Sequence, residues 1–202
     1  MKRPLKYIAE SIQAGYQARG RVKEDKEGTH FLIQMRNLGD DGMVARDSLT
    51  RFTPDRATAP YRVFDGDVLL QVRGARHHAA VVAGLPEDTL ASSHFYILRV
   101  DAREVSPDYL AWYIRQPVAQ SHLLRGAQGA GNVTVVTRAV FESLEVPVPP
   151  LATQTKLVEL DRLQQREQKL TEALLQKRAE WLRGVGQRLA EGKHVPAGKD
   201  AT

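Results

Sequence analysis

Short apolar segments alternate with polar turns through the first half of the chain. Four of them have the length of a strand and carry the Val, Ile, Phe and Tyr that strands favour: residues 31–35, 67–72, 79–83 and 94–100. A dense run of charge at residues 19–28 (RGRVKEDKEG) predicts an exposed loop. The alternation of short strands and turns predicts a mixed or antiparallel sheet.

Helical signals follow the predicted strands. Residues 106–108 (SPD) combine an N-cap hydroxyl, a proline at the first helical position and an acid in the first turn, so a helix is expected to begin there. Pro117 should break or kink this helix, and Thr137 can cap a further short helix over residues 138–143. The first 150 residues are therefore expected to form one α/β domain of the mixed α+β kind.

The C-terminal region has a helical period instead. Spacings of three and four alternate along one stripe, which is the pattern of a coiled-coil seam with two charged interruptions: Leu160, Leu163, Glu167, Leu170, Leu174, Lys177 and Trp181. The other faces are charged or polar, so a narrow stripe is all that the helix can bury. A helix folded back onto its own domain is the alternative, but the narrow stripe favours another helix. Gly184 and Gly186 end the pattern, and a disordered tail is expected at residues 191–202.

The segment LEVPVPPLATQ at residues 144–154 joins the two regions. Prolines fix φ and disfavour helix at the residue before each one, so the chain must run extended before Leu151 can begin a helix. Pro149, Pro150, Leu151 and Gln154 are the residues that define this junction.

The junction resembles the I-P-[LV]-P-P-L-x-x-Q segment of type I restriction-modification specificity subunits, in which a DNA target-recognition domain precedes a coiled-coil spacer. Four further segments resemble motifs of that family in the same order: residues 5–16, 33–42 (IQMRNLGDDG), 64–70 (FDGDVLL) and 105–110 (VSPDYL). Thr153 departs from the family, which usually carries Glu immediately before the Gln. Complete members also hold two recognition domains and two spacer helices, whereas this chain has one of each.

The resemblance implies a half-length specificity subunit, with a target-recognition domain at residues 1–150 and a spacer and dimerisation helix at residues 151–190. Such subunits choose the DNA sequence and catalyse nothing. The implied partners are double-stranded DNA, a second copy of the chain, an adenine-N6 DNA methyltransferase subunit and, in systems that cleave, a restriction subunit. The chain itself would carry no cofactor, because S-adenosylmethionine would bind to the methyltransferase. Two alternatives stay open: a non-catalytic protein-interaction adaptor that uses the helix, and a domain excised from a full-length subunit.

The charge of the chain is compatible with a polyanionic partner. Its formal net charge is +5, an excess that solubility alone could also explain. Residues 61–150 contain arginines but no lysine. Arginine can fork two hydrogen bonds onto a guanine edge or a phosphate, although a GC-rich genome would produce the same bias.

Candidate DNA contacts lie in segments expected to be loops: Tyr16, Arg19, Arg36, Arg73, Arg76, His77, His78, Gln128, Asn132 and Thr134. Residues 71–78 (QVRGARHH) lie between two predicted strands, so they predict a hairpin tip that presents two Arg and two His to bases or phosphates. The glycine-rich residues 126–134 lack the Gly-Lys-Ser/Thr of a phosphate loop, but Gln128 and Asn132 could read adenine edges. A plain polar hairpin and a flexible connector are the respective alternatives.

Catalytic chemistry is not expected from this sequence. There is no Cys, so neither a disulfide framework nor a thiolate metal site is available, and adjacent histidines have poor geometry for a shared metal. Hydrolase, zinc-peptidase and methyltransferase motifs are missing. No apolar run reaches the roughly 18 residues of a membrane span, so a cytoplasmic location without a membrane partner is expected.

Overall fold

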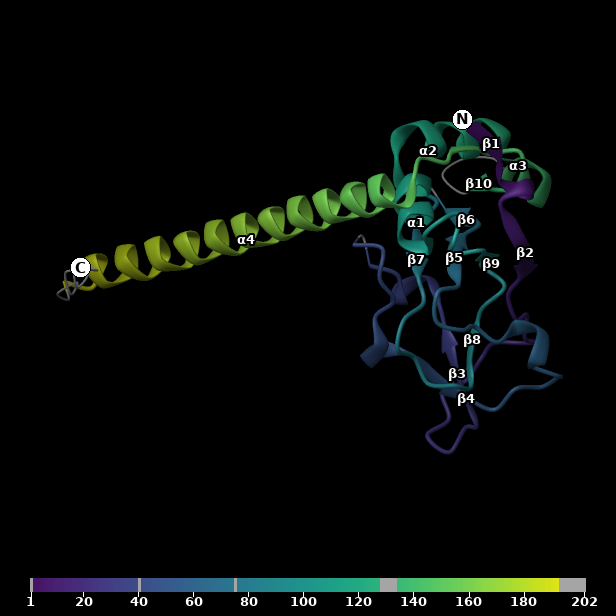
Figure 1. The fold of residues 1–202 in the computed structure, drawn as a ribbon. Helices are drawn as coiled ribbons and strands as arrows, with labels where there is room; N and C mark the ends of the chain where they lie inside the picture. Colours follow the sequence, from purple (N-terminus) through teal and green to yellow (C-terminus); the bar gives the residue numbers. More distant parts are fainter. Residues whose placement is uncertain (1, 40, 75, 128–133, 193–202) are drawn as a thin grey trace. The chain divides into compact units, whose positions relative to one another are not determined.

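Figure 1 shows the computed structural model of the chain, in which residues 2–39, 41–74, 76–127 and 134–192 are described. The chain divides into two units, Met1–Glu159 and Leu160–Thr202. Within the first unit, helices α1 (Pro107–Arg115) and α2 (Pro117–Gly126) lie with strand β1 (Lys2–Pro4) toward one end (Figure 1). Strands β3 (His30–Ile33), β4 (Thr50–Phe52) and β8 (Thr89–Ala91) lie at the other end (Figure 1).

An antiparallel sheet with the order β2-β9-β5-β7 forms the centre of the first unit. Its strands are β2 (Ala9–Ala14), β9 (Phe95–Val100), β5 (Val68–Gln71) and β7 (Ala79–Val81). Strand β5 is apolar at successive positions because both of its faces are covered. Val68 and Leu70 join one apolar cluster and Leu69 joins another.

A second sheet has the order β4-β3-β8. Strand β3 (His30–Ile33) pairs antiparallel with β4 (Thr50–Phe52) and parallel with β8 (Thr89–Ala91). The predicted mixed or antiparallel sheet is therefore confirmed, although as two sheets. The sequence patterns missed β2, β4 and β8, because β2 is half-buried and polar and the other two are only three residues long.

Helices and paired segments complete the first unit. The helices are α1 (Pro107–Arg115), α2 (Pro117–Gly126) and α3 (Arg138–Glu142), and four short 3-10 turns lie at Leu5–Tyr7, Met35–Asn37, Arg46–Ser48 and Ala59–Tyr61. Two small antiparallel pairs join β1 (Lys2–Pro4) to β11 (Glu145–Pro147) and β6 (Arg73–Gly74) to β10 (Thr134–Val135).

Most of the predicted helix boundaries are confirmed. Pro117 separates α1 from α2, and the Thr137 hydroxyl accepts a hydrogen bond from the backbone N–H of Val140, as a cap should. One detail is wrong: Ser106 occupies the N-cap position of α1, but its hydroxyl makes no capping hydrogen bond. Its backbone N–H donates instead to Gln154, 48 residues further along the chain.

The Gly-Asp turn before β5 fixes the centre of the sheet. Gly66 has a φ of 88°, which L side chains rarely adopt. Asp67 is buried, and its carboxylate accepts hydrogen bonds from the Arg99 guanidinium at 2.9 and 3.2 Å and from the Phe64 backbone at 3.0 Å. The turn therefore ties β5 to β9 by charge as well as by the backbone ladder.

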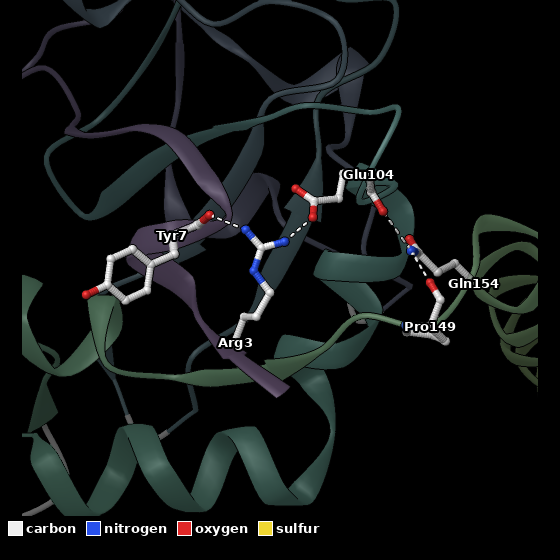
Figure 2. A network of polar contacts seen from close by, with 5 residues as sticks. All are labelled: Arg3, Tyr7, Glu104, Pro149 and Gln154. Atoms are coloured by element: carbon white, nitrogen blue, oxygen red, sulfur yellow. Dashed lines mark hydrogen bonds and ion pairs between the residues drawn. The ribbon is translucent and has the colours of Figure 1, made fainter. Parts of the chain in front are cut away.

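Figure 2 shows the polar network at the start of the long helix α4 (Leu151–Ala190). Gln154 is fully buried; its side-chain amide donates to the carbonyls of Glu104 (3.0 Å) and Pro149 (2.8 Å), and its Oε1 accepts from Ser106 N (2.8 Å). Arg3 adds an ion pair to the Glu104 carboxylate and a hydrogen bond to the Tyr7 carbonyl. The first turn of α4 is thus fastened to the loop that precedes α1.

Two tyrosines of α1 hold the strand that leads into this junction. The hydroxyl of Tyr109 donates to the Pro147 carbonyl at 2.7 Å, and that of Tyr113 donates to the Glu145 carbonyl at 2.9 Å. Burial raises the pKa of Tyr109 to about 12, so the hydroxyl stays protonated and available as a donor.

Helix α4 begins at Leu151, as the prolines predict. Its seam ends near Gly184, but the helix continues through both glycines to Ala190. Apolar seam residues are exposed, from Leu160 at 64% to Trp181 at 65%. The expected tail lies almost wholly outside the described residues. Among the helices that are described, none is both long enough and apolar enough to span a bilayer.

Replacing Gln154 by Leu tests the junction network. The substitution removes three hydrogen bonds of the fully buried Gln154 side chain, to the Ser106 N–H and to the carbonyls of Glu104 and Pro149, so the free energy of unfolding should fall by about 2–4 kcal/mol. Urea unfolding followed by tryptophan fluorescence measures the loss. Thr153→Ala, at the exposed neighbouring position, is the matched control and should change stability little. Equal stabilities for the two variants would show that the amide contributes nothing.

Candidate nucleic-acid interface

The described residues of the first unit form a hollow of about 790 Å³, here called the large hollow. It lies between the loop after β2, the turn after β3, the edge of β4 and the segment that leads into β9. Its polar lining includes Gln17, Arg21, Gln34, Arg36, Arg73 and His94. Glu24 is the acidic residue among the described lining residues. Hydrogen-bond donors and positive charge therefore converge on one concave surface.

Arg36 is anchored at the rim of the large hollow. Its guanidinium donates to the Thr50 hydroxyl at 2.6 Å, while the side chain remains exposed. The turn beneath it is held by buried Asn37, whose amide accepts from Gln34 N at 2.7 Å and donates to the Ser48 carbonyl at 2.8 Å. This fixed turn presents Arg36 and Gln34 side by side in the hollow.

Tyr16, which was expected to contact DNA, is buried. It is 2% exposed, and its ring packs against Phe52 and Tyr61 at centroid distances of 5.7 and 5.6 Å. Burial and the hydrogen bond that its hydroxyl donates to Asp55 at 2.5 Å raise the pKa of Tyr16. The expectation of a direct DNA contact is therefore wrong, because the hydroxyl is used inside the protein and the ring forms the floor of the hollow.

The loop after β2 brings Arg21 into the large hollow, a residue that the sequence interpretation missed. Arg19 was expected there instead; its backbone N–H donates to Asp55 at 2.7 Å and its exposed side chain lies outside the described lining of the hollow. The charge run at residues 19–28 was the signal for this loop, but it could not show which side chain turns inward. Gly15 precedes the loop, where an added Cβ would lie 2.1 Å from the Ser92 carbonyl oxygen.

The predicted hairpin at residues 71–78 is confirmed as a connection but not as a free tip. Gln71 N donates to the His78 carbonyl at 2.8 Å, and β6 within the hairpin pairs with β10. Gly74 has a φ of 137° and lets the chain turn between its two arginines. Arg73 consequently lines the large hollow, whereas Arg76 lines a second one.

His77 is buried rather than exposed, so its expected role as a DNA contact is wrong. It is 0% exposed; its Nδ1 donates to the Gln71 carbonyl at 3.1 Å, and its Nε2 lies 3.3 Å from the Thr134 hydroxyl. That hydroxyl also donates to the Gly74 carbonyl at 2.7 Å, so Thr134 supports the hairpin too. Gln120 of α2 donates to the His77 carbonyl at 2.8 Å and accepts from its backbone N–H at 3.2 Å.

The remaining candidate DNA contacts differ in exposure, and two of them are not described by the structure. Arg36, Arg73 and Arg76 are exposed, and His78 is half-buried at the edge of the second hollow. Gln128 and Asn132 lie outside the described residues. Within the described part of the chain, no group of three His, Cys, Asp or Glu is placed to hold a metal ion.

Similarity to known proteins is found in the structure and not in the sequence. No protein-family model and no curated protein matches the sequence. Among solved structures, the chain is similar to the S subunit of a type I restriction-modification system from M. genitalium, with 12% identity and a TM-score of 0.56 over 94% of this chain and 45% of that one. It is also similar to the HsdS subunit from Thermoanaerobacter tengcongensis, with 18% identity and a TM-score of 0.65 over 100% and 51%.

A third similar structure is described as the structural basis of complex assembly and conformational transition of the type I R-M system. It has 18% identity and a TM-score of 0.69, over 100% of this chain and 51% of that one. The chain therefore has the fold found in type I S subunits, a mixed α+β domain followed by a long helix. It spans about half the length of each of these structures.

The buried imidazole of His77 predicts a pH dependence of stability. Burial lowers the pKa of His77 below its unfolded value of about 6.5, so below that pH the unfolded chain binds a proton that the folded chain does not. The free energy of unfolding should therefore fall with decreasing pH, by at most about 1.4 kcal/mol per pH unit from this group.

Urea unfolding at pH 7.5 and pH 5.5 measures this effect. His77→Gln should be less stable than the wild type at pH 7.5 but should lose less stability between the two values. His78→Gln, at the neighbouring half-buried position, is the control and should keep most of the wild-type dependence, because desolvation and not the neighbouring imidazole is the main cause of the lowered pKa of His77. An unchanged pH dependence in His77→Gln would contradict the assignment.

Proposed function

We propose that this chain is a half-length specificity subunit that binds double-stranded DNA at a particular sequence and directs a partner enzyme to it. The observation that supports this most directly is the convergence of Arg21, Arg36 and Arg73 on one concave surface, in a domain with the fold of type I S subunits. A fixed cationic surface with hydrogen-bonding side chains is what base recognition requires.

The large hollow contains side chains for both purine types. Arginine forks onto the O6 and N7 of guanine, and glutamine onto the N6 and N7 of adenine, so Arg73 and the exposed Gln17 are suited to different base pairs. Arg36 is already held by Thr50, which limits the loss of side-chain freedom when it binds. Sequence choice would then depend on a few side chains held by rigid turns.

DNA methylation, and cleavage where it occurs, would be catalysed by the proposed partner subunits. An adenine-N6 DNA methyltransferase subunit would bind S-adenosylmethionine and modify the selected site, and a restriction subunit would join in systems that cleave. The specificity subunit would contribute binding and position without a catalytic residue or a cofactor of its own.

A second copy of the chain would complete the assembly. The chain spans about half the length of the S subunits that it resembles, and α4 exposes an apolar seam from Leu160 to Trp181. An antiparallel pair of such helices would restore two recognition domains and two spacers, now related by a true twofold axis. The DNA target would then be two inverted half-sites, since the symmetry of the protein is repeated in the site.

A protein-interaction adaptor is the second candidate, because the same exposed seam could bind an unrelated helix. In that case the arginines of the large hollow would only keep the protein soluble. The two functions differ in whether substitutions in the hollow change DNA binding.

The substitution Arg73→Ala distinguishes the DNA-specificity function from the adaptor function. If the side chain forks onto a guanine, the substitution should weaken binding to the selected duplex by about 1–3 kcal/mol and barely change binding to unrelated duplexes. Fluorescence anisotropy with the methyltransferase subunit present measures both affinities. Arg73→Lys should lose the same preference, because an ammonium group cannot form the fork.

Arg125→Ala is the matched control, at an exposed arginine of α2 outside the described lining of the large hollow. It should leave the preference unchanged. Binding and preference that are the same for the wild type and Arg73→Ala would favour the adaptor.

Substitutions in the seam of α4 test the dimer. Leu163→Asp combined with Leu170→Asp should give a monomer in sedimentation, because charge would enter the apolar interface. Gln164→Asp combined with Thr171→Asp adds the same charge with the same spacing one position away, and should leave the dimer intact. A wild type that sediments as a monomer even with DNA and methyltransferase would exclude this assembly.

A further inference from the structure

A second concavity lies on the other side of the hairpin, with a volume of about 570 Å³. This small hollow is lined by Arg76, His77, His78, Arg115, Pro117, Gln120 and Leu124, and it shares no described lining residue with the large hollow. Two arginines and two histidines contribute to it, and no Asp or Glu occurs among its described lining residues. The surface is therefore suited to an anion.

The backbone that carries Arg76 is held rigidly. Gly74 turns the hairpin, and Gln120 bonds to both the backbone N–H and the carbonyl of His77, the residue after Arg76. The buried His77 ring fixes the same segment from beneath. Arg115, in the last turn of α1, donates to the Ala79 carbonyl at 3.3 Å. Cationic groups from two separate elements are thus held around one space.

The small hollow has, among its described lining residues, no side-chain amide left to pair with a base edge. Its one side-chain amide, Gln120, already bonds to both backbone groups of His77 and donates to the Ile114 carbonyl at 2.7 Å. Arginine supplies only donors, so the natural ligand is a group that offers only acceptors and carries negative charge.

We propose that the small hollow binds a phosphate of the DNA backbone, with Arg76 as its principal ligand and Arg115 beside it. This inference rests on the proposed DNA-binding function and divides the hairpin between two tasks. Arg73 faces the base-reading hollow, and Arg76, three residues later, holds the backbone and sets the register of the domain on the duplex.

The test measures the dissociation constants of the full-length chain with its methyltransferase subunit, for a selected and an unrelated duplex over a range of KCl concentrations. For Arg76→Gln the affinity should fall by the same factor on both duplexes. The slope of log affinity against log salt should become shallower by about one unit, because the variant neutralises one phosphate fewer. Arg76→Lys should keep the wild-type slope, because binding a phosphate needs the charge and not the fork.

Arg125→Gln is the control, since it removes the same charge from α2 outside the described lining of the small hollow. It should leave the slope unchanged. Equal slopes for wild type and Arg76→Gln, or equal losses of affinity in Arg76→Gln and Arg125→Gln, would overturn the site while the DNA-binding function stands. A loss confined to the selected duplex would assign Arg76 to base reading and overturn it as well. A wild type that binds neither duplex would overturn the function and the site together.

Discussion

The side-chain amide of Gln154 is the interaction on which the junction between the mixed α+β domain and the start of α4 depends. It satisfies two carbonyls and one N–H at a point where Pro149 and Pro150 have no N–H of their own to offer. Glutamate would lack the donor, and asparagine would be one methylene shorter. Three residues after Leu151, this amide lies in the first turn of α4, which gives a physical reason for the spacing of the Pro-Pro-Leu-x-x-Gln segment.

Paired polar side chains also hold the hairpin at residues 71–78. His77, Gln120 and Thr134 come from three separate segments, and each of them makes hydrogen bonds that hold residues 71–78 in place. His77 is fully buried and the other two are half-buried; polar groups withdrawn from water in this way are costly unless they are paired, and when paired they specify one conformation. The exposed arginines of the hairpin can therefore differ in direction while their backbone stays fixed.

Much of the architecture was predictable from sequence because it rests on local signals. Pro117, Thr137 and the prolines before Leu151 mark helix boundaries, and the apolar run at residues 67–72 marks the central strand. The site was harder to predict because it depends on burial. Tyr16 and His77 occur in polar segments typical of loops, yet tertiary packing covers both. The inward turn of Arg21 likewise depends on contacts that its charged neighbours do not encode.

Selection of bound fragments from a random duplex library, with the full-length chain and its methyltransferase subunit, tests the central claim most directly. The claim is that the large hollow reads sequence and that the helix pairs two copies of the domain. The bound pool should then converge on one motif made of two inverted half-sites at a fixed spacing. A bound pool with the same base composition at every position as the starting library would contradict a role in DNA specificity.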